Sequence, residues 1–387
     1  MITPEQQILF LAAKINLSAD ELAQLDKLLQ TVKNWDKLLE LLTTHAAAPL
    51  FYSKLKNLKN AALIPQNIQS LLMQTYYKVM KNNILLYDAF SQLLAQCAEQ
   101  KIKIIALKGI YLAQTLYGDI ALRQMSDIDI LVNQSDGQKV LEILNSLGYK
   151  SAAGHLSDFI DDTSGLVHYD PMVRDNIIVE LHINLHYKNR NYSMDTKQVI
   201  ENSEEVNINN CKVFSLDIYD LIIYLCIHTD KHFGEAGQTQ FTVFYDLLNI
   251  LEIRGNEINW NKLEQRASVY NANEVVFKYL LLTAFYFNAH LPSQIGDKYN
   301  FLISKKIHRL FRKNLQKITL NQYTTIHFAT IRQMQSNSKR LHYIFDALFP
   351  PKKFMLLKYS PKNPKFYWLY YPVRHFRAAK YVFLNMF

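Results

Sequence analysis

Residues 126–132 read Ser-Asp-Ile-Asp-Ile-Leu-Val, an apolar run that holds two acids, Asp127 and Asp129, two positions apart. Because alternate side chains of a β-strand share one face, this spacing predicts a strand that presents both carboxylates on one side. Two anionic oxygen ligands at the end of a buried strand suit a hard divalent cation. Two such cations can hold the attacking and leaving oxygens of a phosphoryl or nucleotidyl transfer, so this run is the first candidate for a chemical site.

The segment before this run predicts a strand followed by a helix. Residues 103–107 are rich in β-branched side chains and end at Lys108 and Gly109. Residues 110–117 return to the spacing of an amphipathic helix. Glycine lets a backbone approach a ligand closely, and helix N-termini favour anions, so this junction is a candidate phosphate contact.

The segment after the run predicts one helix and two further strands. Ser135 is expected to cap a helix that closes at Gly148. Residues 166–170 and 176–186 are strand-like, and a turn-rich link at 171–175 joins them. The alternation of strands and helices predicts a small mixed α/β sheet.

Helices are predicted on both sides of this core. Residues 4–98 read as helical, with Pro4 at a first helical position and Ser18 as a cap. Residues 68–97 have helical spacing without a breaker, which predicts one long helix or a closely broken pair. The pattern is helical again from 217 to about 288.

The fold class expected is therefore α+β, with a small mixed-sheet α/β core flanked by N-terminal and C-terminal helical regions. The predicted division is a helical region at 1–98, the α/β core at 99–212, a helical domain at 213–300, and a basic, aromatic helical tail at 301–387.

Charge is distributed unevenly along the 387 residues. Residues 301–387 hold 17 Lys and Arg but one acid, Asp346, a net +16, whereas the rest of the chain carries −7. Such asymmetry indicates a local basic surface and a possible anionic partner there. Three readings of the tail stay open: nucleic-acid binding, contact with anionic lipid, or a solvated face that complements the acidic body.

Composition favours a cytoplasmic globular protein. The chain is 49% hydrophobic, and its three cysteines, Cys97, Cys211 and Cys226, are scattered without metal-binding spacing. The N-terminus does not resemble a signal peptide, and no charge-free apolar run reaches about 18 residues, so no transmembrane segment is expected.

Two blocks carry a resemblance to a known family. Residues 106–119 read Ala-Leu-Lys-Gly-Ile-Tyr-Leu-Ala-Gln-Thr-Leu-Tyr-Gly-Asp, and residues 123–132 read Arg-Gln-Met-Ser-Asp-Ile-Asp-Ile-Leu-Val. Together with Val-Glu-Leu-His at 179–182, the 228–232 segment and Tyr-Asp-Leu-Leu at 245–248, they resemble the uncharacterised nucleotidyltransferase family of the polymerase-β-like superfamily. The resemblance covers roughly residues 30 to 290, and it implies a nucleotidyltransferase-like fold for the α/β core.

This resemblance also implies a reaction and a metal site. It implies Mg²⁺-dependent transfer of a nucleoside monophosphate from an NTP to a hydroxyl acceptor, with release of pyrophosphate. The acceptor class stays open among a small molecule, a sugar, a protein and RNA. Asp127 and Asp129 match the metal-binding pair, and Glu180 is the candidate third carboxylate for one or two ions. A lone acid in an apolar strand needs such a reason, because an unpaired buried carboxylate is unfavourable.

The same resemblance implies nucleotide contacts from Lys108, Gly109, Arg123 and Ser126. Arg123 is suited to bind phosphate with two hydrogen bonds. The chain departs from the wider superfamily here, which usually shows Gly-Ser or Gly-Gly where this chain has Lys-Gly, and a shorter gap to the acidic pair.

Structural alternatives stand beside these assignments. Glu180 is alternatively an ion-pair partner of Arg123 or Arg174, and Lys108 alternatively extends its charge to solvent at a strand end. The rival function is a catalytically silent nucleotidyltransferase fold that binds a nucleotide or a partner, with the basic tail contacting nucleic acid.

Two histidine pairs have spacings that zinc can use, but other roles are favoured. His182 and His186 share one strand face, and His228 and His232 lie four apart on a helix without the glutamate of a zinc protease motif. Capping or core hydrogen bonds are the expected roles. Asp246, in an apolar helix, is expected to satisfy a buried His or Arg.

Overall fold

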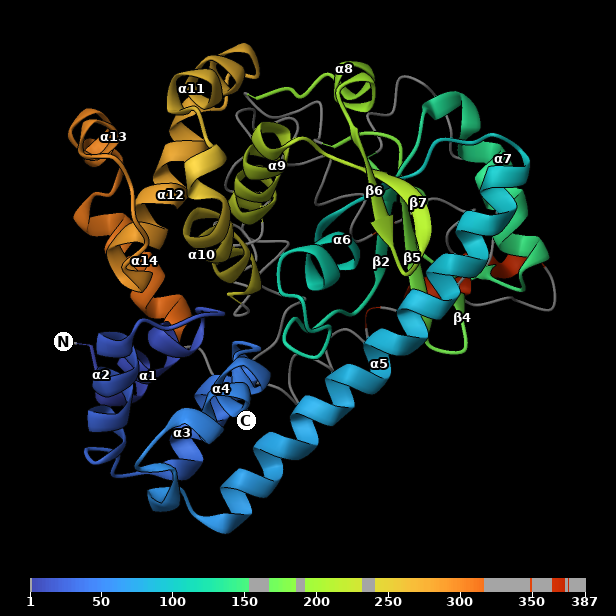
Figure 1. Ribbon diagram of the computed structural model, residues 1–387. Coiled ribbons are helices and arrows are strands. Elements are labelled where there is room, and N and C mark those ends of the chain that lie inside the picture. The colour runs from blue at the N-terminus through green and yellow to red at the C-terminus, as the bar shows by residue number, and fades with distance from the viewer. Residues whose placement is uncertain are drawn as a thin grey trace.

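A computed structural model describes residues 2–152, 167–185, 192–231, 241–316, 349, 364–372 and 375. Its centre is a mixed seven-stranded sheet with the order β3-β4-β5-β2-β1-β7-β6 (Figure 1). The strands are β1 (Ile105–Ala106), β2 (Ile128–Leu131), β3 (Lys150–Ser151), β4 (Met172–Arg174), β5 (Ile177–His182), β6 (Glu204–Ile208) and β7 (Cys211–Ser215). The predicted α+β class, with a mixed sheet flanked by helices, is confirmed.

Strand β2, predicted from the acidic run, lies at the middle of the sheet. It pairs antiparallel with β1 on one side and parallel with β5 on the other. Ile128 and Ile130 are fully buried, as the alternating pattern predicts. The strand expected over 103–107 is shorter than predicted, since only two of its residues pair as β1.

Two hairpins were not predicted. Strand β4 turns into β5 through Asp175 and Asn176, and β6 turns into β7 through Asn209 and Asn210, all four with positive φ between 49° and 67°. Two left-handed residues in succession form the tight turn that matches the twist of paired strands, and Asn and Asp tolerate it. The turn expected around Asp175 is present, but 172–174, within the expected link, form strand β4.

The other expected strand segment is only partly present. Of 166–170, His168 forms an isolated bridge to His182. The strand predicted over 176–186 ends at His182, and residue 186 lies outside the described part of the chain.

The N-terminal helices begin where their caps predict. The helices are α1 (Pro4–Ala12), α2 (Ala19–Leu29), α3 (Trp35–Thr44), α4 (Ala48–Lys54) and α5 (Gln66–Glu99), with 3-10 turns at Leu55–Asn57 and Ala61–Leu63. Thr3 and Ser18 form capping boxes with Gln6 and Glu21. Of the two alternatives for 68–97, the structure has the single long helix, α5.

The helices that lie between strands along the chain are α6 (Lys108–Thr115), α7 (Gln134–Ser146) and α8 (Thr196–Glu201). The expectation that Ser135 caps α7 is wrong, because the helix starts earlier, with Asn133 in the cap position. Gly148 follows its end with a φ of +88°, as a C-terminal cap requires.

The C-terminal helices are α9 (Ile218–Lys231), α10 (Thr242–Arg254), α11 (Trp260–Val269), α12 (Asn273–Phe287), α13 (Ser293–Tyr299) and α14 (Lys305–Gln316), with short 3-10 turns at Gly255–Glu257, Asn300–Leu302 and Pro364–Leu369. Aromatic side chains join α12, α13 and α14, and α12 with α1. Phe311 of α14 stacks on Tyr286 of α12 with ring centroids 3.8 Å apart. Phe10 of α1 meets Phe287 edge-on at 5.0 Å.

Contacts therefore cross the predicted division of the chain. The first helices pack with α10, α12 and α14. Asn249 of α10 bonds the backbone at both Ala13 and Ile15, and the ring of Phe10 contacts Phe287 of α12 and Phe311 of α14. In Figure 1, α5 runs from these first helices to α7 along the sheet. Of the predicted tail, α14 belongs to the helical body, whereas 317–348, 350–363, 373–374 and 376–387 lie outside the described residues. No helix among the described residues has the length and hydrophobicity needed to cross a bilayer.

Lys54 is a buried lysine whose ammonium donates to an uncharged carbonyl of its own helix. It ends α4 at 5% exposure, and its Nζ donates to the Leu50 carbonyl at 2.9 Å. Burial lowers the pKa of Lys54 to about 7. Because the folded-state pKa lies below the ordinary value of 10.5, the charge opposes folding below pH 7, and this penalty disappears as the pH rises toward 10.5.

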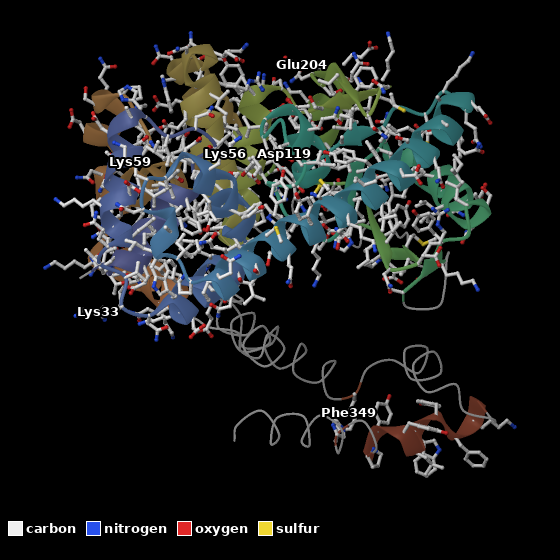
Figure 2. All side chains as sticks on the ribbon, turned by 60° about the horizontal axis from the view of Figure 1, so that its bottom comes forward. Lys33, Lys56, Lys59, Asp119, Glu204 and Phe349 are labelled. Carbon is white, nitrogen blue, oxygen red and sulfur yellow. The ribbon has the colours of Figure 1, made fainter. Side chains whose placement is uncertain are left out.

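Replacing Lys54 with Met is therefore expected to stabilise the protein by roughly 2–4 kcal/mol at pH 6, and by progressively less toward pH 10. Urea unfolding at both pH values measures the difference. Lys56→Met is the matched control, because Lys56 is exposed (Figure 2). An equal effect of the two substitutions at pH 6 would contradict the assignment.

Candidate active site

The register between β2 and β5 places acids from two strands side by side. In this parallel pair Asp129 lies opposite Glu180, and Leu131 lies opposite His182. Directly opposed residues in neighbouring strands share a face, and so do residues two apart on one strand. Asp127, Asp129, Glu180 and His182 therefore face the same side of the sheet.

Asp129 is the centre of this group. Its Oδ1 lies 2.9 Å from Nε2 of His182, which in turn lies 3.6 Å from Oε2 of Glu180. The ligand atoms of Asp129, Glu180 and His182 all lie within 4.8 Å of one another. Asp129 and His182 are each 4% exposed, so the group is largely shielded from solvent.

Lys108 completes the group from β1 and α6. It is the first residue of α6, and its Nζ lies 2.7 Å from Oδ1 of Asp129. The ring of Tyr224, from α9, lies with its centroid 5.9 Å from the same Nζ. The helical body thus closes over the sheet at the point where the charges gather.

The electrostatics of the group follow from burial and from these pairs. Burial alone would raise the pKa of Asp129, but Lys108 and His182 outweigh it and hold that pKa far below its usual range. The nearby His182 ring also holds the pKa of Glu180 below its ordinary value. Burial and repulsion from Asp129 raise the pKa of Asp127 to about 6.

This donor set fits a divalent cation. Three carboxylates face one ammonium, so the group carries an excess of negative charge when all are ionised. Carboxylate oxygens are the ligands of Mg²⁺ and Mn²⁺, and an imidazole nitrogen suits Mn²⁺. Nδ1 of His182 is also buried, and no hydrogen-bond partner for it lies among the described residues.

Arg123 lies in a different environment from the one predicted. Its Nε and Nη2 bond the two carboxylate oxygens of Asp246 at 3.1 and 2.7 Å, and Tyr117 donates to the same carboxylate at 2.9 Å. The expectation that Asp246 satisfies a buried basic residue is confirmed. Phosphate binding by Arg123 stays a prediction, and the structural use of its guanidinium is the role that this geometry favours.

Gly109 and Ser126 occupy positions on either side of the loop that enters β2. A Cβ on Gly109 would lie 2.8 Å from Nη1 of Arg123 and 2.9 Å from Cγ of Met125, so glycine is needed there for packing. Ser126 Oγ donates to Oδ1 of Asp127 at 3.1 Å, which orients that carboxylate.

The alternative ion pair for Glu180 is not formed. Arg123 pairs with Asp246, and Arg174 donates to the Leu147 carbonyl and to Gln92. Of the histidine pairs, His186 and His232 lie outside the described residues.

Sequence reasoning overlooked the direct bond between His182 and Asp129. The sequence did show that Glu180 and His182, two apart on one strand, share a face. Only the register of β2 on β5 shows that this face is the one that carries Asp129.

A mixed sheet with acids on two adjacent strands, facing a lysine at a helix start, is the arrangement expected of a nucleotidyltransferase-like core. The family model described as "Uncharacterised nucleotidyltransferase" matches residues 31–288, and the chain belongs to this family. The match includes both the sheet and helices α9 to α12, and it supports nucleotidyl transfer as the class of reaction.

The other comparisons add little. No curated protein sequence matches the chain. Among solved structures, the antibiotic-resistance factor ANT(2'')-Ia is similar over 53% of this chain and 95% of its own, with 11% identity and a TM-score of 0.29. We draw no argument from so remote a likeness.

Replacing Asp246 with Asn is expected to destabilise the protein by roughly 3–5 kcal/mol, because it leaves the Arg123 guanidinium buried without its counter-charge. Asp136→Asn is the control, since its pair with Lys139 is on the surface and contributes under about 1 kcal/mol. Urea denaturation followed by circular dichroism measures both. Equal losses in the free energy of unfolding would show that the buried pair contributes no more to stability than the surface pair.

Proposed function

We propose that this protein transfers a nucleoside monophosphate from an NTP to a hydroxyl acceptor and releases pyrophosphate, with a divalent metal ion such as Mg²⁺. The observation that carries the proposal is the pairing of Asp129 with Glu180 on adjacent strands, within reach of the Lys108 ammonium. Family membership supports the same class of reaction.

Asp127, Asp129 and Glu180 would hold the metal. Ligand atoms of Asp129, Glu180 and His182 lie within 4.8 Å of one another, so His182 is close enough to act as a further ligand or to orient Asp129. Asp127 would join from the same face of β2. A bound divalent ion supplies positive charge that offsets the triphosphate and polarises the reacting oxygens. The Lys108 ammonium adds a fixed positive charge at the same place, in a buried setting where its field is weakly screened.

The chain's own groups then direct the transfer. The acceptor oxygen attacks the α-phosphorus, the bond from that phosphorus to the bridging oxygen breaks, and pyrophosphate leaves. The carboxylate nearest the acceptor takes the hydroxyl proton. Ser126 orients Asp127, and Gly109 lets the Arg123 loop pack against α6, so both hold the acidic strand in place.

Replacing Asp129 with Asn tests this function. Turnover of labelled NTP into product in a cell extract, which supplies the unknown acceptor, is expected to fall by a factor on the order of 100 or more. Metal-dependent NTP binding, measured by calorimetry, is expected to weaken as well. Asp88→Asn, which removes an exposed carboxylate from α5, is the control. Unchanged binding and turnover in Asp129→Asn would exclude the role given to Asp129.

A binding function is the second candidate, supported by one observation in α14. Five exposed basic residues lie on this twelve-residue helix: Lys305, Lys306, Arg309, Arg312 and Lys313. The helix has no acid, and Phe301 beside it is 71% exposed. A basic face with an exposed aromatic ring is suited to single-stranded nucleic acid.

Reversing two of these charges, Arg309→Glu with Arg312→Glu, is expected to weaken binding to a single-stranded RNA. If both residues bind phosphate, the slope of log affinity against log salt falls by about 1.4, at roughly 0.7 for each phosphate that the variant no longer neutralises. Filter binding at several salt concentrations measures it. Lys33→Glu with Lys59→Glu is the matched control, since both lysines are exposed elsewhere (Figure 2). An equal decrease in both double variants would indicate a nonspecific effect of net charge.

A further inference from the structure

Lys108 has an unusual backbone conformation for a residue with a side chain. Its φ is +45°, in the left-handed region that favours glycine, although it is the first residue of α6. The preceding Leu107 is extended and bonds the Asp129 carbonyl at 3.0 Å, so the chain turns sharply between β1 and α6. The Lys108 side chain is thereby brought to the acidic face of β2.

The ammonium of Lys108 lies among the carboxylates that would hold metal. Nζ is 2.7 Å from Oδ1 of Asp129, and it also attracts Asp127 and Glu180 electrostatically. The Lys108 side chain is only 12% exposed. An ammonium that donates to a ligand oxygen from inside the site occupies space that a second metal ion would need.

The charge of the site leads to the same conclusion. With Asp127, Asp129 and Glu180 ionised and Lys108 protonated, these four groups carry −2, which one divalent ion neutralises. A second divalent ion beside a buried ammonium would leave excess positive charge, and buried charge without compensation is unfavourable.

We propose that Lys108 permanently fills one of two cation positions at this site, so that the centre takes a single divalent ion. The inference rests on the proposed function, since it assumes that the three carboxylates bind metal. Lys108 then acts as a built-in cation, and it competes with any metal ion that approaches Oδ1 of Asp129.

Titration of the full chain with Mn²⁺ alone, followed by electron paramagnetic resonance of the free ion, tests this proposal. Wild type is expected to bind one ion. Lys108→Met is expected to bind Mn²⁺ at least roughly tenfold more tightly, because the competing charge is gone. Lys108→Gln is a second neutral variant, and circular dichroism establishes which variants are folded.

Two controls separate charge from general disturbance. Lys108→Arg keeps the positive charge and is expected to bind Mn²⁺ about as wild type does. Lys103→Met removes a lysine that precedes the same strand but whose Nζ bonds the Ile200 carbonyl, away from the acids, and it is expected to have no effect. In crystals of Lys108→Met soaked with Mn²⁺, anomalous scattering is expected at the place that Nζ occupies in the wild type.

The outcomes distinguish the two levels of the argument. Binding of one Mn²⁺ by wild type, with tighter binding in both neutral variants, supports the inference. Two ions in wild type, or neutral variants that bind like Lys103→Met, overturn the inference and leave the metal centre intact. Folded wild type and variants that bind no Mn²⁺ overturn the metal centre of the proposed function, and the inference with it.

Discussion

Parallel pairing of β2 with β5 sets Asp129 directly beside Glu180, so two carboxylates meet in a largely buried part of the sheet. Such a meeting is unfavourable unless positive charge or hydrogen-bond donors compensate it. Lys108 and His182 both lie against the same oxygen of Asp129, which supplies part of that compensation. The remaining negative charge is what makes the site suited to a divalent ion.

A second set of buried contacts, around the ion pair of Arg123 with Asp246, holds the loop before β2 in position. Arg123 and Asp246 form a doubly hydrogen-bonded pair that joins the loop before β2 to helix α10. Asn83 of α5 donates to the carbonyl of Arg123 and, in the same loop, to that of Ile120. Asp119, labelled in Figure 2, accepts from Tyr76 of α5 at 2.6 Å. The loop that delivers Asp127 is therefore fixed by contacts from two helices, α5 and α10.

The sequence carried the local features of this structure well. The alternation around Asp127 and Asp129 predicted strand β2, and the caps at Thr3 and Ser18 mark helix starts because capping depends on neighbouring residues alone. The hairpin at Asn209 was overlooked, although two successive asparagines were the available signal. Features that depend on distant contacts were beyond local reasoning. Arg123 and Asp246 are 123 positions apart, and only the packing of α10 shows that this arginine meets a carboxylate where phosphate was expected. His182 was likewise considered as a pair with His186 on its own strand, whereas its partner is Asp129 on the neighbouring strand.

Lys108 combines an unfavourable backbone conformation with a buried ionic contact. Its φ of +45° is one that glycine adopts without strain. A lysine in this conformation is strained, so a favourable contact of its side chain is needed to offset the strain. The 2.7 Å contact between Lys108 Nζ and Oδ1 of Asp129 offsets it, because the ammonium neutralises a carboxylate that is buried in the sheet. Glycine at this turn would relieve the backbone strain but would leave the buried Asp129 carboxylate without the Lys108 ammonium.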